Sequence, residues 1–289
     1  MKTPLSIFFF ILYFFPFSST FSFSSASSYS PDSSLTAQMQ LVNSLYEQKK
    51  YFDAITEAKR ILFFDTLNAF SFEANTLIAE SYKKGGKLSD ALRFFAQASK
   101  FASTPEEKYN NKISAIRIHI LNRSIAIAIR QTNEMANQPE FSSKKADLTY
   151  WRGWAYMFAD RWEEAAGEFN SIDSSHYLKN FCLDIDNKEY SVTFARTISY
   201  FLPGAGQVYT GEYLNGILSL GWNLLSGYLT ITAFREERVF DGAALLSLLW
   251  MRFYTGNISN AEKFAKEKNL EISNSALNFL QLNYKGLKP

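Results

Sequence analysis

Apolar residues recur at intervals of three and four over residues 35–185, the spacing that places them on one face of an α-helix. The pattern is clearest in residues 78–98, where Gly85 and Gly86 separate two amphipathic segments. Two helices joined by a short turn are the simplest interpretation of that stretch. The pattern therefore predicts paired helices and an all-α fold.

An alanine returns at a constant interval through the same region. Ala54, Ala91, Ala128 and Ala165 follow one another 37 residues apart. The residues nine positions before them are Leu45, Tyr82, His119 and Tyr156. Two helices approach closely where one carries a small residue and a larger side chain fills the space beside it. The interval predicts four helix pairs over residues 35–185.

Two of these pairs resemble the tetratricopeptide repeat. The small and aromatic positions of that family are matched by Ala79, Tyr82, Ala91, Phe95 and Ala98 in the second pair, and by Gly153, Tyr156, Ala165 and Phe169 in the fourth. The interval of 37 exceeds the usual ~34, and His119 and Thr132 replace aromatic residues in the third pair. The resemblance implies a curved solenoid whose concave face is lined by the first helix of each pair.

Positions that face inward in that family form a candidate partner-binding surface. In the third and fourth pairs they include Ile113, Arg117, Ile120, Tyr150, Trp154, Met157 and Phe158. This apolar set favours a protein or peptide ligand, because aromatic and apolar anchors commonly dominate interfaces. The alternative is that the chain's own next helix, near residues 177–183, covers the surface.

The C-terminal third has the pattern of a membrane hairpin. Residues 214–234 contain no charge and would extend about 31 Å as a helix at ~1.5 Å per residue, enough to cross a bilayer. A second apolar segment, residues 239–254, carries Asp241 and Arg252 near its ends. It is either a second span whose charged side chains reach the interfaces, or a buried or re-entrant helix. We expect a hairpin module over residues 186–257 and a helical tail over 258–289.

The stretch FLPGAGQVYTGEYLNG, residues 201–216, precedes the first apolar segment. It has no lysine and follows no convincing strand, which argues against a phosphate-binding loop. It resembles the bacterial two-span membrane modules marked by Pro-Gly-x-Gly-Gln-x-Tyr-x-Gly. The matching residues are Pro203, Gly204, Gly206, Gln207, Tyr209, Gly211 and Gly216, with Tyr254, Gly256 and Asn257 after the second segment. This resemblance implies a membrane location and no particular reaction.

Small and polar residues form a stripe along the first apolar segment. They are Gly216, Ser219, Asn223, Ser226, Gly227 and Thr230, spaced by one helical turn or less. Small residues let membrane helices approach, and Asn or Ser side chains hydrogen-bond across them. The stripe either packs within the hairpin or serves self-association or the passage of a polar ligand.

The N-terminus has the composition of a targeting segment. Lys2 precedes an almost wholly apolar run over residues 5–17, and a Ser-rich stretch follows. This order predicts a signal peptide over residues 1–26 and a linker over 27–34, and so an exported protein. The alternative is an uncleaved N-terminal anchor.

Composition narrows the chemistry that the chain can offer. The 30 Lys and Arg are balanced by 28 Asp and Glu without a basic block, which argues against nucleic acid as a partner. Cys182 is the only cysteine, and the histidines number two. We find no metal-ligand spacing, no nucleophile motif and no cofactor motif, and expect no enzymatic activity.

Together these features predict an exported scaffold protein that is anchored in a membrane. The repeats would bind protein or peptide partners on the periplasmic side of the inner membrane, with membrane lipid and a second copy as further partners. The alternative is an oligomeric pore or transport component in which the repeats assemble or regulate the membrane module.

Overall fold

The computed structural model describes residues 33–289, and this part of the chain is helical with no strand. The all-α prediction is confirmed for the described residues. The expected signal peptide and nearly all of the expected linker lie outside them. The first helix begins at Ser33, two residues before the predicted start of the repeats.

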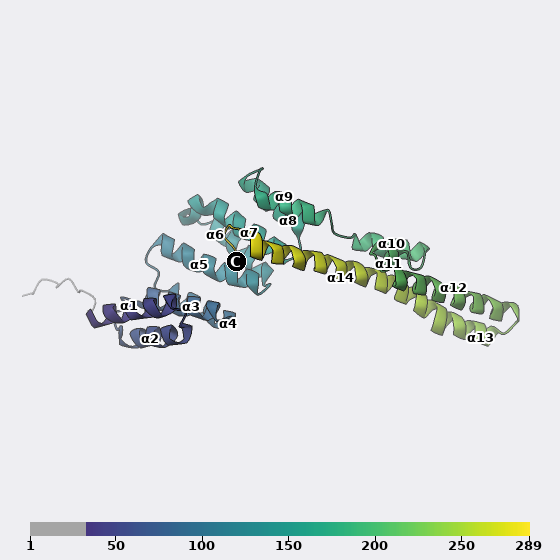
Figure 1. Ribbon diagram of the computed structural model, residues 1–289, viewed down its shortest axis with the longest axis horizontal. Helices are drawn as coiled ribbons and strands as arrows, with labels where there is room; N and C mark the ends of the chain where they lie inside the picture. The colour runs from purple at the N-terminus through teal and green to yellow at the C-terminus, as the bar shows by residue number, and fades with distance from the viewer. Residues whose placement is uncertain (1–32) are drawn as a thin grey trace, which may run out of the picture.

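Four successive helix pairs form the N-terminal body (Figure 1). The pairs are α1 (Ser33–Glu47) with α2 (Tyr51–Phe64), α3 (Ser71–Lys84) with α4 (Leu88–Ala98), α5 (Pro105–Leu121) with α6 (Ile125–Ala136), and α7 (Lys145–Phe158) with α8 (Trp162–Ile172). The second helices begin 37 residues apart, as the alanine interval predicts. A short 3-10 helix, η1 (Pro139–Lys144), precedes α7.

The turn inside each pair repeats at the same interval. One residue in each turn has a left-handed backbone, with φ between 53° and 73°: Lys49, Gly86, Arg123 and Asp160. The N–H of the next residue donates to the carbonyl oxygen five positions back, the bond of a Schellman C-cap. The acceptors are Leu45, Tyr82, His119 and Tyr156. The constant interval therefore reflects a repeated turn as well as repeated packing.

The repeated alanines are all buried, with at most 1% of their surface exposed. At Gly153 two helices approach closely, because an added Cβ would lie 2.7 Å from the Phe169 ring. The expected pairing of a small residue with an aromatic ring is therefore present in the fourth pair.

A capping box begins the first helix of the third pair. The Thr104 hydroxyl accepts from the N–H of Glu107, and the Glu107 carboxylate accepts from the N–H of Thr104.

The buried residues of the pairs separate into two clusters. One contains residues of α1 to α4 together with Ile118 of α5. The other joins α5 to α8 with α9 (Tyr177–Asp186) and with the last helix of the chain. The boundary between the two clusters runs along α5.

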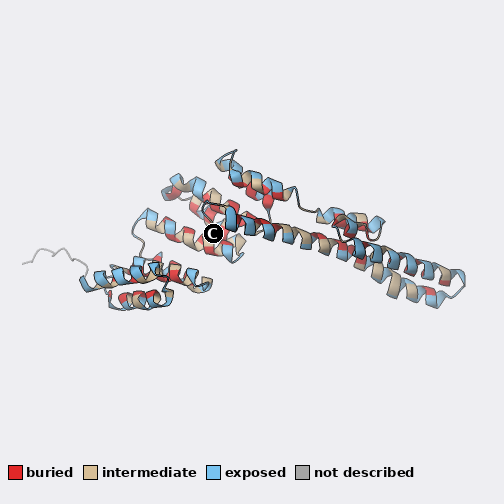
Figure 2. Ribbon diagram, viewed as in Figure 1, coloured by how far each residue is buried: buried red, intermediate tan, exposed pale blue. Residues whose placement is uncertain are grey.

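The C-terminal third extends away from the repeats (Figures 1 and 2). Its elements are α10 (Val192–Phe201), α11 (Ala205–Tyr209), α12 (Tyr213–Arg235), α13 (Val239–Ala244), the π-helical segment η2 (Leu245–Trp250) and α14 (Met251–Asn283). The helix formed by α13, η2 and α14 returns antiparallel to α12, and α14 continues until it lies against the repeats.

The predicted boundary at residue 257 falls inside this returning helix. Ala244 and Trp250, where the segments join, both have right-handed helical backbones. No proline interrupts residues 239–283, and Asn257, Ala261 and Ala265 continue one buried face across the expected boundary. The predicted tail is therefore not a separate element, because one helix belongs to both the hairpin and the repeat body.

Candidate functional site

The surface predicted to bind a partner is covered by the chain's own last helix. Ile113, Ile120, Trp154 and Met157 are buried, with at most 8% of their surface exposed. They lie in one cluster with Ala276 and Leu280 of α14, and Tyr150 and Phe158 pack against that cluster. The first helices of the third and fourth pairs thus face α14, and only Tyr150 and Phe158 of these six side chains stay partly exposed.

Hydrogen bonds fix the residues after α14 to the same surface. The Tyr150 hydroxyl donates to the carbonyl oxygen of Leu287, and an Arg117 Nη donates to that of Lys288 at 2.7 Å. The Arg117 guanidinium also lies 5.0 Å from the centre of the Trp151 ring. Burial lowers the pKa of Arg117 and raises that of Tyr150. Both side chains that the sequence placed in a binding surface are therefore used internally.

Aromatic rings continue this contact towards α9. Tyr284 lies 6.1 Å from Trp154 and stacks on Tyr177 at 5.9 Å, measured between ring centres. Phe279 stacks on Phe181 at 5.8 Å. Segments of the chain itself, α9 and α14, therefore both pack against this part of the repeats. Helix α9 buries Leu178 and Cys182 in the same cluster, whereas α14 occupies the inner surface.

The glycine-rich stretch forms a tight junction around Asn257 of α14. Its Oδ1 accepts from the N–H of Gly204 at 2.7 Å and from Gln207 Nε2 at 3.1 Å. It also accepts from the Ser219 hydroxyl at 2.9 Å, and its Nδ2 donates to the carbonyl oxygen of Ser199 at 3.1 Å. One buried side chain thus joins α10, the turn before α11, and α12. The two motif segments, distant in sequence, meet at this residue.

Glycine is required at two positions of the junction. Gly204 has a φ of 90°, which only glycine adopts readily, and an added Cβ would strike the backbone of Gly216. A Cβ on Gly206 would collide with the carbonyl of Ala195 and lie 2.6 Å from the Ala261 Cβ. The backbone of α11 therefore contacts α10 and α14 directly.

The other motif residues surround this junction. The Tyr254 hydroxyl donates to the carbonyl oxygen of Tyr200 at 2.9 Å, and the Tyr209 hydroxyl accepts from the N–H of Ser191 at 3.1 Å. Gly211 has a φ of 81° at the turn before α12. Pro203 is half-buried just before the turn, and Gly256 has open space beside it.

The small and polar stripe of α12 faces the returning helix. Gly216, Asn223, Ser226, Gly227 and Thr230 are buried, and a Cβ on Gly227 would lie 3.4 Å from the Trp250 ring. Trp222 stacks on Phe253 at 5.1 Å. The stripe therefore packs within the helix pair. Two buried side-chain oxygens, Gln207 Oε1 of α11 and Asn223 Oδ1 of the stripe, have no hydrogen-bond partner in the structure.

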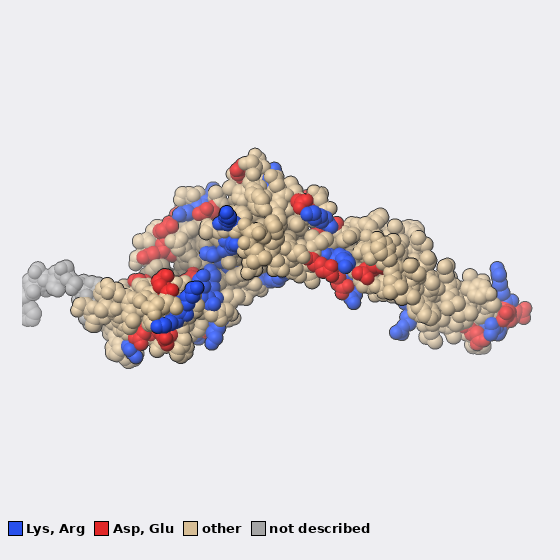
Figure 3. All heavy atoms as spheres, viewed as in Figure 1, with Lys and Arg blue, Asp and Glu red and all other residues tan. Residues whose placement is uncertain are grey.

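The opposite face of α12 is exposed and apolar. It includes Leu214, Ile217, Leu218, Leu224, Leu225 and Ile231. Among the described helices, α12 alone is long and apolar enough to cross a membrane, and only 28% of its most apolar window is buried. In Figure 3 charged side chains gather at the turn between α12 and α13 and along the middle of α14, with largely uncharged surface between them.

Two residues that connect α14 to the rest of the chain were not predicted from the sequence. The Asn269 side chain pairs with both the N–H and the carbonyl of Tyr190, at 2.8 and 2.9 Å. The Ser273 hydroxyl accepts from Trp162 Nε1 at 2.9 Å. They are four residues apart on a polar helix, and this spacing is too common to indicate a contact.

Within residues 33–289, His, Cys, Asp and Glu nowhere gather in a group of three or more that could hold a metal ion. The single cysteine, Cys182, is buried, and burial raises its pKa to about 12. No protein-family model matches the chain, and no curated protein matches it at a significant level.

Proposed function

We propose that this protein is a membrane-anchored scaffold of tetratricopeptide-like repeats. The repeats form a solenoid that binds protein or peptide, and the pair formed by α12 and the returning helix inserts into a membrane. In this proposal α14 is a rigid connection between the two parts. The anchor lies in the inner membrane and the repeats lie on the periplasmic side.

The single observation that carries the proposal is the inverted arrangement of α12. Its buried face is small and polar, including Asn223, Ser226 and Thr230, whereas its exposed face is made of large apolar side chains. A core helix of a water-soluble protein buries its large apolar residues, and soluble proteins rarely expose a large apolar patch. Membrane helices associate through small and polar residues and present apolar ones to lipid.

The ends of the helix pair agree with insertion. Arg235 ends α12, and Glu236, Glu237 and Arg238 form the turn before α13; all four are exposed. At the other end Lys268 and Glu212 lie 3.6 Å apart. Helix α12 has 23 residues, about 34 Å at ~1.5 Å per residue, which matches the thickness of a bilayer core.

Alkaline carbonate extraction tests the anchor. The full-length chain should stay with membranes, whereas Leu218→Arg combined with Leu225→Arg should release it, because a charge on the lipid face opposes insertion. Leu67→Arg is the matched control, since Leu67 is an exposed residue between α2 and α3. Release of the unaltered chain by carbonate would refute the proposal.

Thiol labelling tests the orientation. A cysteine at Glu237 should resist an impermeant reagent added from the periplasmic side, whereas a cysteine at Lys100 in the repeats should react. Both positions are exposed, and the native Cys182 is buried, so background labelling should be low. Arg235 at the end of α12 and Arg238 in the turn favour the cytoplasmic side for that turn. Equal labelling at both positions would refute this orientation.

A second candidate function makes the membrane module the working part, as an oligomeric pore or transport component. It is favoured by the unpartnered oxygens of Gln207 and Asn223 and by Arg252. Arg252 is exposed and precedes Phe253, which stacks on Trp222 near the middle of α12, so it lies far from either end of the pair. Polar groups at such a depth usually mark a polar pathway or an interface. Asn223→Leu should abolish transport in this case and leave a scaffold unaffected.

A further inference from the structure

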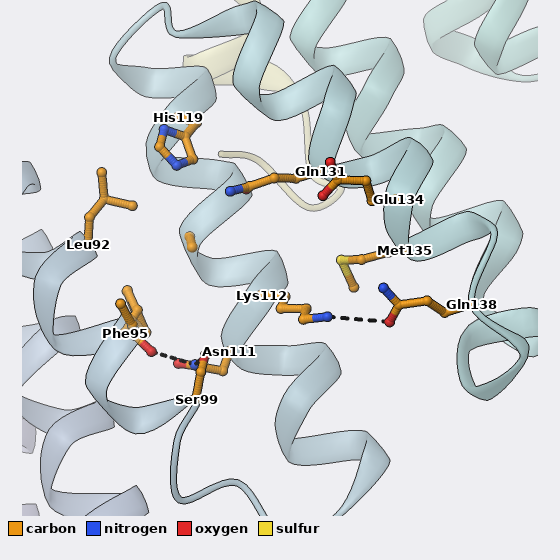
Figure 4. A pocket seen from close by; sticks show the side chains of 12 residues that line it. Leu92, Phe95, Ser99, Asn111, Lys112, His119, Gln131, Glu134, Met135 and Gln138 are labelled. Atoms are coloured by element: carbon orange, nitrogen blue, oxygen red, sulfur yellow. Dashed lines mark hydrogen bonds between the residues drawn. The ribbon is translucent and has the colours of Figure 1, made fainter.

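Grooves on the repeats and on the C-terminal third differ in the side chains that line them. The groove between α4, α5 and α6 has charged and polar groups along its walls, among them Lys112, His119 and Glu134 (Figure 4). The groove between α10, α11 and the start of α12 has a volume of about 380 Å³ and no charged side chain in its lining. Its larger apolar side chains are Phe194, Ile198, Leu202, Val208, Ile217 and Leu220.

The apolar surface around this second groove is exposed where α10 ends. Phe201 is 85% exposed, and Leu202 and Val208 are exposed beside it. Ile217 belongs to the exposed apolar face of α12 and lines the same groove. The exposed surface of α10 and α11 is therefore continuous with that face of α12, and soluble proteins rarely expose an apolar patch of this extent.

Charged residues lie at the two ends of the α10–α11 segment and none lies between them. Residues 197–211 contain no charge. A guanidinium nitrogen of Arg196 lies 3.7 Å from a carboxylate oxygen of Glu262, and at the other end Glu212 lies 3.6 Å from Lys268. Glu262 and Lys268 are six residues apart on α14, which is about 9 Å at ~1.5 Å per residue. Both ends of the segment therefore lie near the charged middle of α14 that Figure 3 shows.

The bend between α10 and α11 lies further along α14, in the direction of η2. The carbonyl oxygen of Tyr200 accepts from the Tyr254 hydroxyl, and the N–H of Gly204 donates to Asn257. Tyr254 is eight residues from Glu262, about 12 Å at ~1.5 Å per residue. The segment thus leaves the charged region, turns beside the uncharged part of the helix pair, and returns.

The position of the bend along α12 gives its depth. The Ser219 hydroxyl and the N–H of Gly204 donate to the same oxygen of Asn257. Ser219 is six residues after Tyr213, where α12 begins, which is about 9 Å at ~1.5 Å per residue. Half of a bilayer core is about 15 Å thick. When α12 spans the membrane, the bend lies inside the nearer leaflet.

The backbone at the bend has the partners that such a position requires. The N–H of Gly206 donates to the Ser199 hydroxyl at 3.1 Å, and Asn257 Nδ2 donates to the carbonyl of Ser199 at 3.1 Å. Irregular backbone within hydrocarbon is tolerated only where protein groups satisfy it. The apolar side chains face outwards at the bend, whereas its polar backbone groups bond to α10 and α14.

We propose that α10 and α11 form a re-entrant element in the leaflet nearer to the repeats, and that their groove beside α12 holds an acyl chain of a membrane lipid. The proposal rests on the membrane anchor proposed above and adds a second inserted segment and a lipid site to it. The apolar lining and the continuity with α12 favour an acyl chain over a peptide, because peptide N–H and C=O groups would lack partners there.

Spin labels measure the depth of the bend in a bilayer. Single cysteines replace Phe201, Ile217 or Lys266 in the full chain, which is placed in phosphatidylcholine nanodiscs. All three positions are exposed and the native Cys182 is buried, so the labels should leave the fold unchanged, which circular dichroism checks. The label at Phe201 should collide with a water-soluble nickel complex about tenfold less often than the label at Lys266, because the bilayer core contains no water.

The label at Ile217 separates this proposal from the anchor itself. It should be protected from nickel to the same extent as the label at Phe201. Nickel access at Phe201 equal to that at Lys266, with Ile217 protected, would overturn the re-entrant element and leave the anchor intact. Nickel access at Ile217 as well would overturn both.

A photoreactive side chain tests the lipid in the groove. Benzoylphenylalanine in place of Leu202 should form phospholipid adducts on illumination, because Leu202 is exposed and lines the groove. The same replacement at Tyr177, an exposed residue of α9 in the repeat body, is the matched control and should form none. Adducts are identified by mass spectrometry.

Filling the groove locates the adduct. Val208→Trp places a large ring in the groove and should remove most of the lipid adducts at Leu202, since Val208 is an exposed residue of its lining. Circular dichroism checks that the variant folds. No adduct at Leu202, or an equal yield with and without Val208→Trp, would overturn the lipid site.

Discussion

The hydroxyl of Tyr150 donates a hydrogen bond to the carbonyl oxygen of Leu287, across 137 residues of chain. The contact joins the fourth helix pair to the residues that follow α14, and Trp154 lies beside it against Tyr284. The returning helix is therefore part of the repeat core at one end and part of the glycine-rich junction at the other. Displacing it should affect both.

Trp154→Ala should destabilise the repeat body by about 3–5 kcal/mol, the usual cost of deleting a buried tryptophan side chain. Trp154 is 2% exposed and touches both the repeat core and the end of α14. Phe52→Ala is the control, because Phe52 is 80% exposed and should change stability by less than about 0.5 kcal/mol. Urea unfolding of the solubilised chain measures both. Similar losses in the two variants would mean that α14 does not close this surface.

The repeated turns give a prediction with opposite signs at equivalent positions. Lys49→Gly should stabilise the first pair by up to about 1 kcal/mol, because glycine adopts the left-handed backbone without strain. Gly86→Ala should destabilise the second pair by about 1 kcal/mol, and purely through the backbone, since no atom lies within 4 Å of the added Cβ. Thermal unfolding measures the shifts. Changes of the same sign would contradict the repeated C-cap.

The turns also show what the sequence could predict. The interval of 37 follows from a periodic pattern, and local patterns indicate helix pairs because small and aromatic residues recur at fixed steps. The left-handed backbone could be predicted from the sequence only at Gly86, because the equivalent residues Lys49, Arg123 and Asp160 are not glycines. The periodic part of the fold was therefore predictable in its spacing, and its turn geometry only in part.

Glu189 should make stability depend on pH. It lies between α9 and α10, and burial, then Asp186 and Asp160, raise its pKa from 4.5 to about 7, while Ser273 acts in the other direction. The folded chain therefore keeps a proton that the unfolded chain releases between pH 4.5 and 7, so the free energy of unfolding falls as pH rises through that window.

Glu189→Gln should remove this contribution. The variant should melt at a higher temperature than the parent at pH 8, with the difference shrinking towards pH 4.5. The measurement is the melting temperature at pH 4.5, 6 and 8 in both chains. A constant difference across the three values would show that Glu189 does not titrate as inferred.

The covered surface shows what the sequence could not predict. The inward positions were chosen from the repeat pattern, and Ile120 and Trp154 do lie on the inner side of their helices in the cluster that includes α14 residues. Nothing local indicates that a helix beginning more than 90 residues later will cover them, because packing between distant segments depends on the whole fold. The spacing of Asn257, Ala261 and Ala265 indicates a buried helix face, but it does not indicate which surface this face packs against.

Gly206→Ala should loosen the junction. The added Cβ would collide with the Ala195 carbonyl and the Ser199 hydroxyl, and lie 2.6 Å from the Ala261 Cβ, so α11 must move away from α14. We expect a loss of about 1–3 kcal/mol, as for other overpacked sites. Gly221→Ala is the matched control on α12, where no atom lies within 4 Å of the new Cβ. Thermal unfolding in detergent should separate the two variants; equal melting temperatures would argue against the close approach.

Asn257→Leu should disrupt the same junction by a different route. The Gly204 N–H and the Ser199 carbonyl both bond to this side chain, and the site is buried, with Asn257 2% exposed. Leucine has a similar volume and leaves both groups without a partner, at a cost of about 1–3 kcal/mol for each unpaired group. Asn260→Leu, one turn further at an exposed position, should have little effect. Limited proteolysis should cut the Asn257→Leu chain near residues 202–212, because the turn loses its attachment to α14, and should spare the control. Protection of that turn in both variants would show that Asn257 does not hold it.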